Sequence, residues 1–312
     1  MSLLAVEKLT VAFPGQIAVR ETSFAIEPGE TLALVGESGC GKSVTAFSVM
    51  RLLPPNAKVA SGRILFDGTD LLALSPAEMR AVRGKQISLI QQEPMTSLNP
   101  VLTIGLQISE VVRRHEKLSR KQARARAIEL LDLVSIPDSH RRIDDYPHNL
   151  SGGMRQRVMI AMAVACHPKL LIADEPTTAL DVTTQHQILL LLRELVEEFG
   201  ISLLFVTHDF GVVAELCDDL CVIYAGQTVE AGKVGAILDA PSHPYTRALL
   251  ACHPDRATSF IGIPGMVPSP LSRPAGCLFA PRCRDVRPAC LEAPPPQGRA
   301  QSGVEVRCVQ YA

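Results

Sequence analysis

A short glycine-rich stretch, GESGCGKS from Gly36 to Ser43, has the composition and spacing of a phosphate-binding loop. It matches G-x-x-x-x-G-K-[ST] in full, follows the apolar run TLALV and precedes a segment predicted to be helical. Glycines let successive backbone N–H groups point at phosphate oxygens, and the helix N-terminus adds a favourable dipole. We therefore predict that Lys42 reaches the β- and γ-phosphates of ATP and that Ser43 ligates Mg²⁺. The residues predicted to surround the nucleotide here are Gly36, Glu37, Ser38, Gly39, Cys40, Gly41, Lys42, Ser43 and Val44.

Two acidic residues end a second apolar run, LLIADEP. Asp174, at the end of a predicted buried strand, is placed to hold Mg²⁺, and Glu175 can polarise the attacking water as a general base. Taken alone, such a pair could simply be an acidic strand terminus. Its position downstream of the glycine-rich loop favours the catalytic interpretation.

A third motif, NLSGG, places two glycines and a potential N-cap, Ser151, before a helix. It would form a second phosphate-facing helix terminus in the same chain. One γ-phosphate cannot easily satisfy both termini, so a head-to-tail pair of chains would resolve the conflict, with Ser151, Gly152 and Gly153 of one chain facing the ATP of the other. The alternative is an ordinary capped helix.

The 312 residues suit one large domain with a smaller appendage. Short β-rich stretches open the chain, and strands then alternate with helices, which predicts an α/β fold around a mostly parallel sheet. A helical block at about 94–155 interrupts this alternation and is predicted to be an inserted subdomain. Proline and glycine become frequent after Leu250, so we predict a main domain over 1–250 and a separate C-terminal extension over 251–312.

Composition excludes several classes of protein. Hydrophobic residues make up 47% and charged residues 20%, which is ordinary for a globular protein, and a net charge of −1 argues against nucleic-acid binding through bulk electrostatics. No apolar run approaches the roughly 18 residues of a membrane span. The N-terminus lacks the features of a signal peptide, so we expect a cytoplasmic protein.

Together these motifs resemble the ATP-binding subunit of ABC transporters over residues 3–250. The resemblance implies a P-loop NTPase fold: a RecA-like parallel core, an N-terminal antiparallel β subdomain and an inserted helical subdomain. It also implies that Phe13 stacks on adenine. Gln92, rather than its neighbour Gln91, would be the glutamine that joins Ser43 and Asp174 at Mg²⁺ and reports the nucleotide state to the helical subdomain.

The same resemblance assigns three further positions. LSGGM is similar to the family's signature sequence, with Met154 in place of the usual glutamine. Ala179 to Asp181 resembles the loop that crosses the dimer interface. His208, in FVTHDF, resembles the switch histidine that contacts the γ-phosphate.

The stretches PMTSLNP and SHPYTRALL and the tail RPAGCLFAPRCRDVRPAC resemble the oligopeptide/dipeptide/nickel importers. This implies an ATPase that energises uptake of peptides or related solutes, bound peripherally to the cytoplasmic face of the inner (plasma) membrane. Its implied partners are a second, homologous ATPase in a heterodimer, two membrane permeases and an extracytoplasmic solute-binding protein, without nucleic acid. Nickel chelates, opines and sugars are alternative cargoes. A soluble non-transport ABC ATPase would call for tandem domains, a coiled coil or basic arms, which the sequence lacks.

Four of the nine cysteines, Cys277, Cys283, Cys290 and Cys308, lie in the tail. A reducing compartment disfavours disulfides, which leaves free thiols, zinc or an iron–sulfur cluster. The residues alone do not decide between the two metals; resemblance to importers that carry a [4Fe–4S] cluster favours iron–sulfur. A proline-rich tail with few apolar residues would also need a metal to fold. Arg282 and Arg284 could offset the charge of a thiolate-bound cluster or be solvated.

Overall fold

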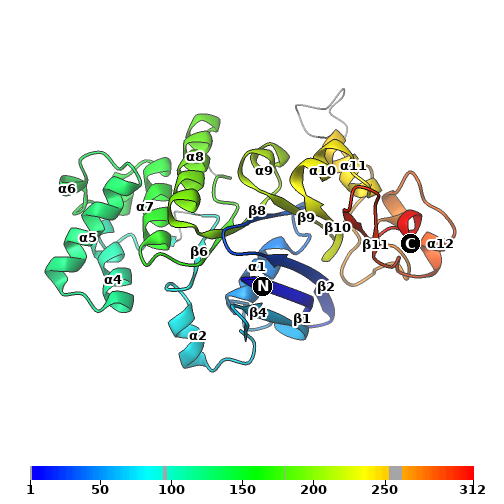
Figure 1. Cartoon of the computed structure of the whole chain (residues 1–312), viewed down its shortest axis with the longest axis horizontal. Helices are drawn as coiled ribbons and strands as arrows, with labels where there is room; N and C mark the ends of the chain where they lie inside the picture. The colour runs from blue at the N-terminus through cyan, green and yellow to red at the C-terminus, as the bar shows by residue number, and fades with distance from the viewer. Residues whose placement is uncertain (1, 94–96, 179, 253–261) are drawn as a thin grey trace. The chain divides into compact units, whose positions relative to one another are not determined.

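The computed structural model describes residues 2–93, 97–178, 180–252 and 262–312 (Figure 1). Pro94 and Ala179, named above, lie outside these ranges. The chain divides into two compact units, the first made of residues 1–73 and 205–312 and the second of residues 74–204. The predicted boundaries at residue 250 and at about 94–155 stay predictions.

The first unit contains an antiparallel sheet with strand order β2-β1-β4-β5. Its strands are β1 (Leu4–Phe13), β2 (Gln16–Ile26), β4 (Lys58–Phe66) and β5 (Thr69–Asp70). The tight turn between β1 and β2 requires a left-handed residue, supplied by Gly15 at φ 74°. Helix α1 (Lys42–Val49) packs against β1 and β2. This sheet is the predicted N-terminal antiparallel subdomain.

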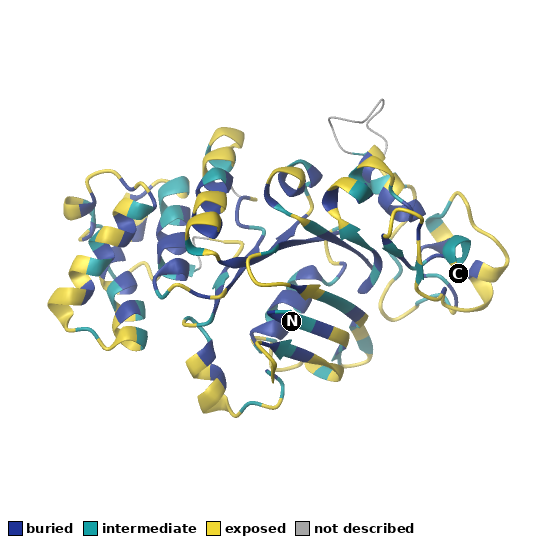
Figure 2. Cartoon of the chain, in the orientation of Figure 1, coloured by how far each residue is buried: buried dark blue, intermediate teal, exposed yellow. Residues whose placement is uncertain are grey.

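A second set of strands in this unit runs in the order β11-β12-β10-β9-β3. They are β3 (Thr31–Val35), β9 (Asp219–Tyr224), β10 (Gln227–Lys233), β11 (Gly298–Arg299) and β12 (Glu305–Val306). β3 and β9 are parallel, and the strands beyond β9 pair antiparallel. β3, with sequence TLALV, is buried along its whole length, which is typical of a strand covered on both faces. Figure 2 colours the described residues of the chain by how far each is buried.

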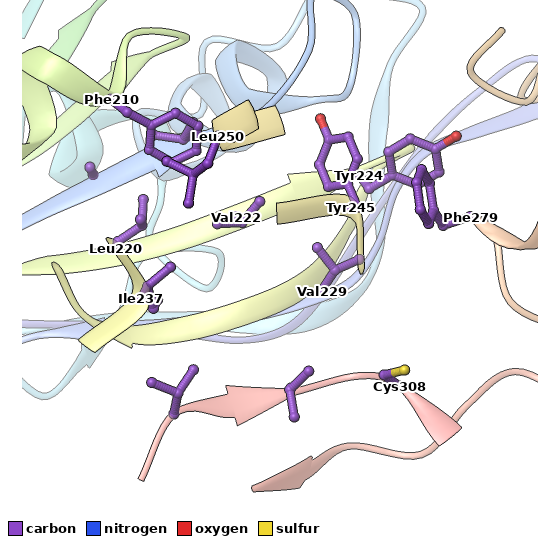
Figure 3. Packing of buried hydrophobic residues seen from close by; sticks show 14 of the residues in the cluster. Phe210, Leu220, Val222, Tyr224, Val229, Ile237, Tyr245, Leu250, Phe279 and Cys308 are labelled. Atoms are coloured by element: carbon purple, nitrogen blue, oxygen red, sulfur yellow. The ribbon is translucent and has the colours of Figure 1, made fainter. Parts of the chain in front are cut away.

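Helices α9 (Phe210–Leu216), α10 (Val234–Asp239) and α11 (Pro244–Ala251) complete the core of this unit. The C-terminal extension contributes to the same hydrophobic cluster through residues that include Phe279, Val306 and Cys308 (Figure 3). Its only regular elements among the described residues are short: α12 (Ala289–Glu292), β11, β12 and two 3₁₀ turns, Ala280–Arg282 and Val309–Tyr311. Apolar packing therefore holds the extension to the core, which the predicted need for a metal did not anticipate.

The second unit holds the parallel pair β6 (Ile87–Ile90) and β7 (Leu170–Asp174) and most of the helices. The helices are α2 (Pro76–Val82), α4 (Ile104–Glu116), α5 (Arg120–Leu133), α6 (Ser139–Arg142), α7 (Gly152–Val164) and α8 (Val182–Phe199). Helices α4, α5 and α7 pack on one another; α4 and α5 lie inside the predicted helical insertion, and α7 extends beyond its predicted end to Val164. Strand β8 (Ser202–Thr207) crosses the division between the units.

Most predicted elements are present, and their ends follow local signals. Ser119 and Ser151 accept hydrogen bonds as N-caps, and Gly200 ends α8 in a left-handed conformation. Helix α1, the segment predicted to be helical after the glycine-rich loop, ends at Val49. Among the described residues, the structure has no helix long and apolar enough to cross a membrane.

Candidate functional site

The glycine-rich loop lies in the first unit, between β3 and α1. Gly41 is the N-cap residue of α1, at φ 102°, and has no side chain with which to cap the helix. The first N–H groups of α1 are therefore not capped by Gly41, as a phosphate-binding terminus requires. Gly36 is pressed against its neighbours: a Cβ there would lie 2.7 Å from Sγ of Cys40 and would also collide with the carbonyl oxygen of Ile223. The loop's path thus requires glycine at both positions.

Lys42 is nearly buried, with 5% of its surface exposed. Its Nζ donates hydrogen bonds to the carbonyl oxygens of Gly36, at 2.8 Å, and Glu37, at 3.2 Å. The ammonium is thereby held over the loop. Cys40 beside it is buried as well, and burial raises the pKa of its thiol. Cys40 is therefore a packed, protonated filler of the loop and not a reactive thiolate.

Glu37 connects the loop to the C-terminal extension. Its carboxylate accepts hydrogen bonds from both terminal nitrogens of Arg282, at 2.7 and 3.0 Å, and its N–H donates to the Tyr245 hydroxyl at 3.0 Å. This hydrogen bond with Glu37 raises the pKa of Arg282. The sequence left Arg282 either near a metal cluster or in solvent. The solvated alternative is wrong, because the side chain is 3% exposed and paired with Glu37 of the phosphate loop, and the other stays a prediction.

Two other predicted residues lie in the first unit. Phe13 is the last residue of β1, half-buried and paired with Gln16 across the turn. His208 is exposed immediately after β8. The next residue, Asp209, caps α9 by accepting a hydrogen bond from the Gly211 N–H at 2.8 Å, so the backbone beside His208 is fixed by a helix start.

The second unit brings together Gln92 and Glu175. Asp174 ends β7 and is 2% exposed, whereas Glu175 turns out of the strand at φ 45°. Its Oε2 accepts hydrogen bonds from Nε2 of Gln92, at 3.1 Å, and from the Thr178 hydroxyl, at 3.0 Å. A left-handed conformation is costly for a residue with a Cβ, so this geometry at Glu175 is consistent with a functional constraint.

The signature motif is also in the second unit. Ser151 caps α7 by accepting a hydrogen bond from the Met154 N–H at 3.3 Å, and Ser151 and Gly152 are exposed. A Cβ on Gly153 would lie 2.6 Å from the methyl group of Thr184. Thr184 in turn donates two hydrogen bonds to Asp181, the N-cap of α8, at 2.8 and 2.9 Å. These bonds lower the pKa of Asp181. The signature glycines and Asp181 therefore share one support, Thr184.

The four tail cysteines line one cavity of about 10 Å³. Cys277 donates its N–H to the carbonyl oxygen of Cys290 at 2.7 Å, and burial raises the pKa of the thiols of Cys277, Cys283 and Cys308. Such a volume holds about one water molecule. Within the described ranges, no group of three or more His, Cys, Asp or Glu residues is arranged to hold a metal ion. The donor set suits a soft metal, but its arrangement does not show one.

Comparison with known proteins identifies the family. A model described as "ABC transporter" matches residues 19–178. A probable peptide ABC transporter ATP-binding protein of Sinorhizobium fredii is 50% identical, over 98% of this chain and 94% of that protein. This chain belongs to the ABC transporter family. A second model, "Oligopeptide/dipeptide transporter, C-terminal region", matches residues 229–290 of this ABC protein.

Two further relatives carry more specific names. The oligopeptide transport ATP-binding protein OppD of Bacillus subtilis is 50% identical, over 94% of this chain and 85% of its own length. The dipeptide transport ATP-binding protein DppD of the same species is 49% identical, over 98% of this chain and 94% of its own. The predicted importer subfamily is confirmed by these matches.

Solved structures confirm the predicted P-loop fold and the ATPase class. The cassette MJ0796, solved as a dimer in a post-hydrolysis state with ADP and Pi, is 29% identical with a TM-score of 0.66; the match covers 74% of this chain and 98% of that one. CbiO1 of Clostridium perfringens is 30% identical with a TM-score of 0.65, over 76% of this chain and 91% of its own. This ABC chain is thus an ATP-using enzyme of that fold.

The crowding at Gly36 can be tested by substitution. Gly36→Ala would force its Cβ against Cys40 and the Ile223 carbonyl oxygen, so the phosphate loop must shift. We expect Mg·ATP binding to weaken by about tenfold or more, an effect of roughly 1.4 kcal/mol, measured by equilibrium titration of the purified subunit. Gly235→Ala, in α10 with no atom within 4 Å of the new Cβ, is the matched control. Equal affinities for the two variants would contradict this account of the loop.

Proposed function

We propose that this ABC subunit binds and hydrolyses Mg·ATP to energise uptake of peptides through a multi-subunit importer. The observation that carries the peptide assignment is the match of residues 229–290 to the oligopeptide/dipeptide transporter C-terminal region, because this region lies outside the ATP-binding motifs common to the family. Relatives that are about 50% identical in sequence and are named for peptide, oligopeptide and dipeptide transport support the assignment.

In the proposed mechanism, Lys42 would hold the phosphates of ATP. Ser43, Asp174 and Gln92 would be the residues that hold Mg²⁺. Mg²⁺ supplies charge neutralisation on the β- and γ-phosphates. Glu175 accepts the proton of the attacking water, and its Oε2 is the atom now hydrogen-bonded to Gln92 Nε2. The amide oxygen Oε1 of Gln92 would be the atom that ligates Mg²⁺, while Nε2 donates to Glu175, so a single side chain would link the base to the Mg²⁺ site.

The exposed signature motif supports a proposal about the partner subunits. We propose that the Ser151–Gly153 terminus completes the ATP site of a second, homologous ATPase, with Asp181 at that interface and His208 at the γ-phosphate of the chain's own nucleotide. The exposure of Ser151, Gly152 and His208 supports this arrangement. Two membrane permeases and an extracytoplasmic solute-binding protein complete the proposed importer, and the ATPase sits on the cytoplasmic face of the membrane. Phe13 is proposed to stack on adenine.

The base assignment predicts a specific variant phenotype. Glu175→Gln keeps the shape of the side chain but removes the proton acceptor, so we expect turnover to fall by about 10² or more while ATP binding persists. Phosphate release and ATP-dependent dimerisation, read by size-exclusion chromatography, are the measurements. The conservative change Glu194→Gln, on α8, is the control. Normal hydrolysis by Glu175→Gln would refute the assignment.

The transport assignment is tested in cells. In a strain that lacks this gene and carries the remaining subunits, we expect uptake of labelled di- and oligopeptides to be lost and to return with the wild-type gene but not with Lys42→Ala. Uptake of nickel chelates, opines and sugars is measured in parallel. Unchanged peptide uptake together with loss of one of the other solutes would reassign the cargo.

The tail metal also remains a proposal. We propose that the four cysteine thiols are the ligands of a [4Fe–4S] cluster, with zinc as the alternative; its support is the resemblance and the convergence of these thiols on one cavity. Anaerobically purified protein is then expected to carry about four iron atoms per chain and to lose them in Cys290→Ser but not in Cys166→Ser, outside the tail. Stoichiometric zinc without iron would reject the cluster, and the absence of both metals would reject a metal site.

A further inference from the structure

Arg282 of the C-terminal extension is bound on several sides within the first unit. Besides its two hydrogen bonds to Glu37, its Nε donates to the carbonyl oxygen of Pro264 at 3.0 Å, and one terminal nitrogen donates to that of Ile263 at 3.1 Å. The other terminal nitrogen donates to the Tyr224 hydroxyl at 3.3 Å. All three nitrogens of the Arg282 guanidinium thus donate hydrogen bonds, and these bonds fix the orientation in which the guanidinium faces Glu37.

Glu37 is held through both its backbone and its side chain. The N–H of Glu37 donates to Tyr245, and its carboxylate is gripped by Arg282. Tyr245 and Tyr224 form an aromatic cluster with Phe279 of the extension, with ring centroids 4.6 to 5.4 Å apart (Figure 3). Glu37, the second residue of the phosphate loop, is therefore supported by an aromatic cluster to which the extension contributes Phe279.

The extension reaches the nucleotide half-site at a second point. Arg273 donates a hydrogen bond to the carbonyl oxygen of Ile17 at 2.6 Å. Ile17 lies at the start of β2, just beyond the turn that follows Phe13. Both segments predicted to hold the nucleotide in this unit, the phosphate loop and the turn beside Phe13, are thus contacted by an arginine of the extension.

We infer that Arg282 is a positioning residue for ATP, acting through Glu37. A carboxylate in the second position of a phosphate loop would repel an incoming triphosphate if it were free to turn towards it. The paired hydrogen bonds from Arg282 neutralise the charge of the Glu37 carboxylate and keep that carboxylate turned towards the extension. They also fix the backbone of Glu37, and with it the loop whose N–H groups face the phosphates. The extension is therefore part of the ATP-binding apparatus. This inference rests on ATP binding by the chain and not on its cargo.

The pair is tested with Arg282→Ala, alone and together with Glu37→Gln. Loss of the arginine strands a partly buried carboxylate beside the phosphates, so we expect the Kd and KM for Mg·ATP to rise about tenfold or more, as when one partner of a charged hydrogen bond is removed. kcat should change far less, because the bond is made before and during the reaction. In the Glu37→Gln background, which carries no charge to strand, Arg282→Ala should weaken binding by less than about threefold.

Controls separate this role from general stability. Arg284→Ala, exposed two residues along the same loop, should bind ATP like the wild type. If Arg282→Ala does not fold, Arg282→Lys, which keeps the charge but loses the fork, should still raise Kd. Unchanged Kd in a folded Arg282 variant, or an equal loss in both backgrounds, would overturn the inference. Failure of the wild-type chain to bind ATP would instead overturn the proposed function.

Discussion

A glycine-rich loop cannot impose its own shape, so its neighbours must impose it. Gly41 lies at φ 102°, with a hypothetical Cβ only 3.2 Å from the Ala18 carbonyl oxygen, and the Cys40 carbonyl oxygen accepts a hydrogen bond from Gly226 at 2.8 Å. Gly36 lies against Ile223 at the end of β9. Contacts from β2, from β9 and from the turn after β9 therefore determine the backbone path of the phosphate loop. All of these contacts come from the first unit.

The second unit holds its predicted site residues through shared contacts. Glu175 accepts hydrogen bonds from Gln92 and Thr178 at the same oxygen, Oε2. Thr184 similarly joins two motifs: it donates hydrogen bonds to Asp181, and its methyl group packs against Gly153. The signature motif and the loop that contains Asp181 are therefore held by the same residue.

Features encoded over a few neighbouring residues could be predicted from the sequence. The phosphate loop, the acidic strand end and the cap at Ser151 depend on neighbours in the chain, and the family comparisons agree with the fold they predict. The capping box of Ser75 and Glu78, which starts α2, could also have been predicted from the sequence but was overlooked. The pair of Glu37 and Arg282 could not be predicted from the sequence, because 245 residues separate its members and either charge could equally be solvated.

The folding of the extension was the least predictable part, for a physical reason. Its proline-rich composition suggested too little apolar surface for a core, yet β12 pairs with β10 and Phe279 packs against Tyr224 and Tyr245. The extension packs its apolar residues into the hydrophobic core of the ATP-binding domain, and its own amino-acid composition gives no sign of this shared core. Because Cys283 follows Arg282 directly, the cavity lined by the cysteines lies one residue from the brace of the phosphate loop. The turn Ala280–Arg282 that carries the arginine thus leads directly into the wall of that cavity, so one short segment of the extension contributes to both places.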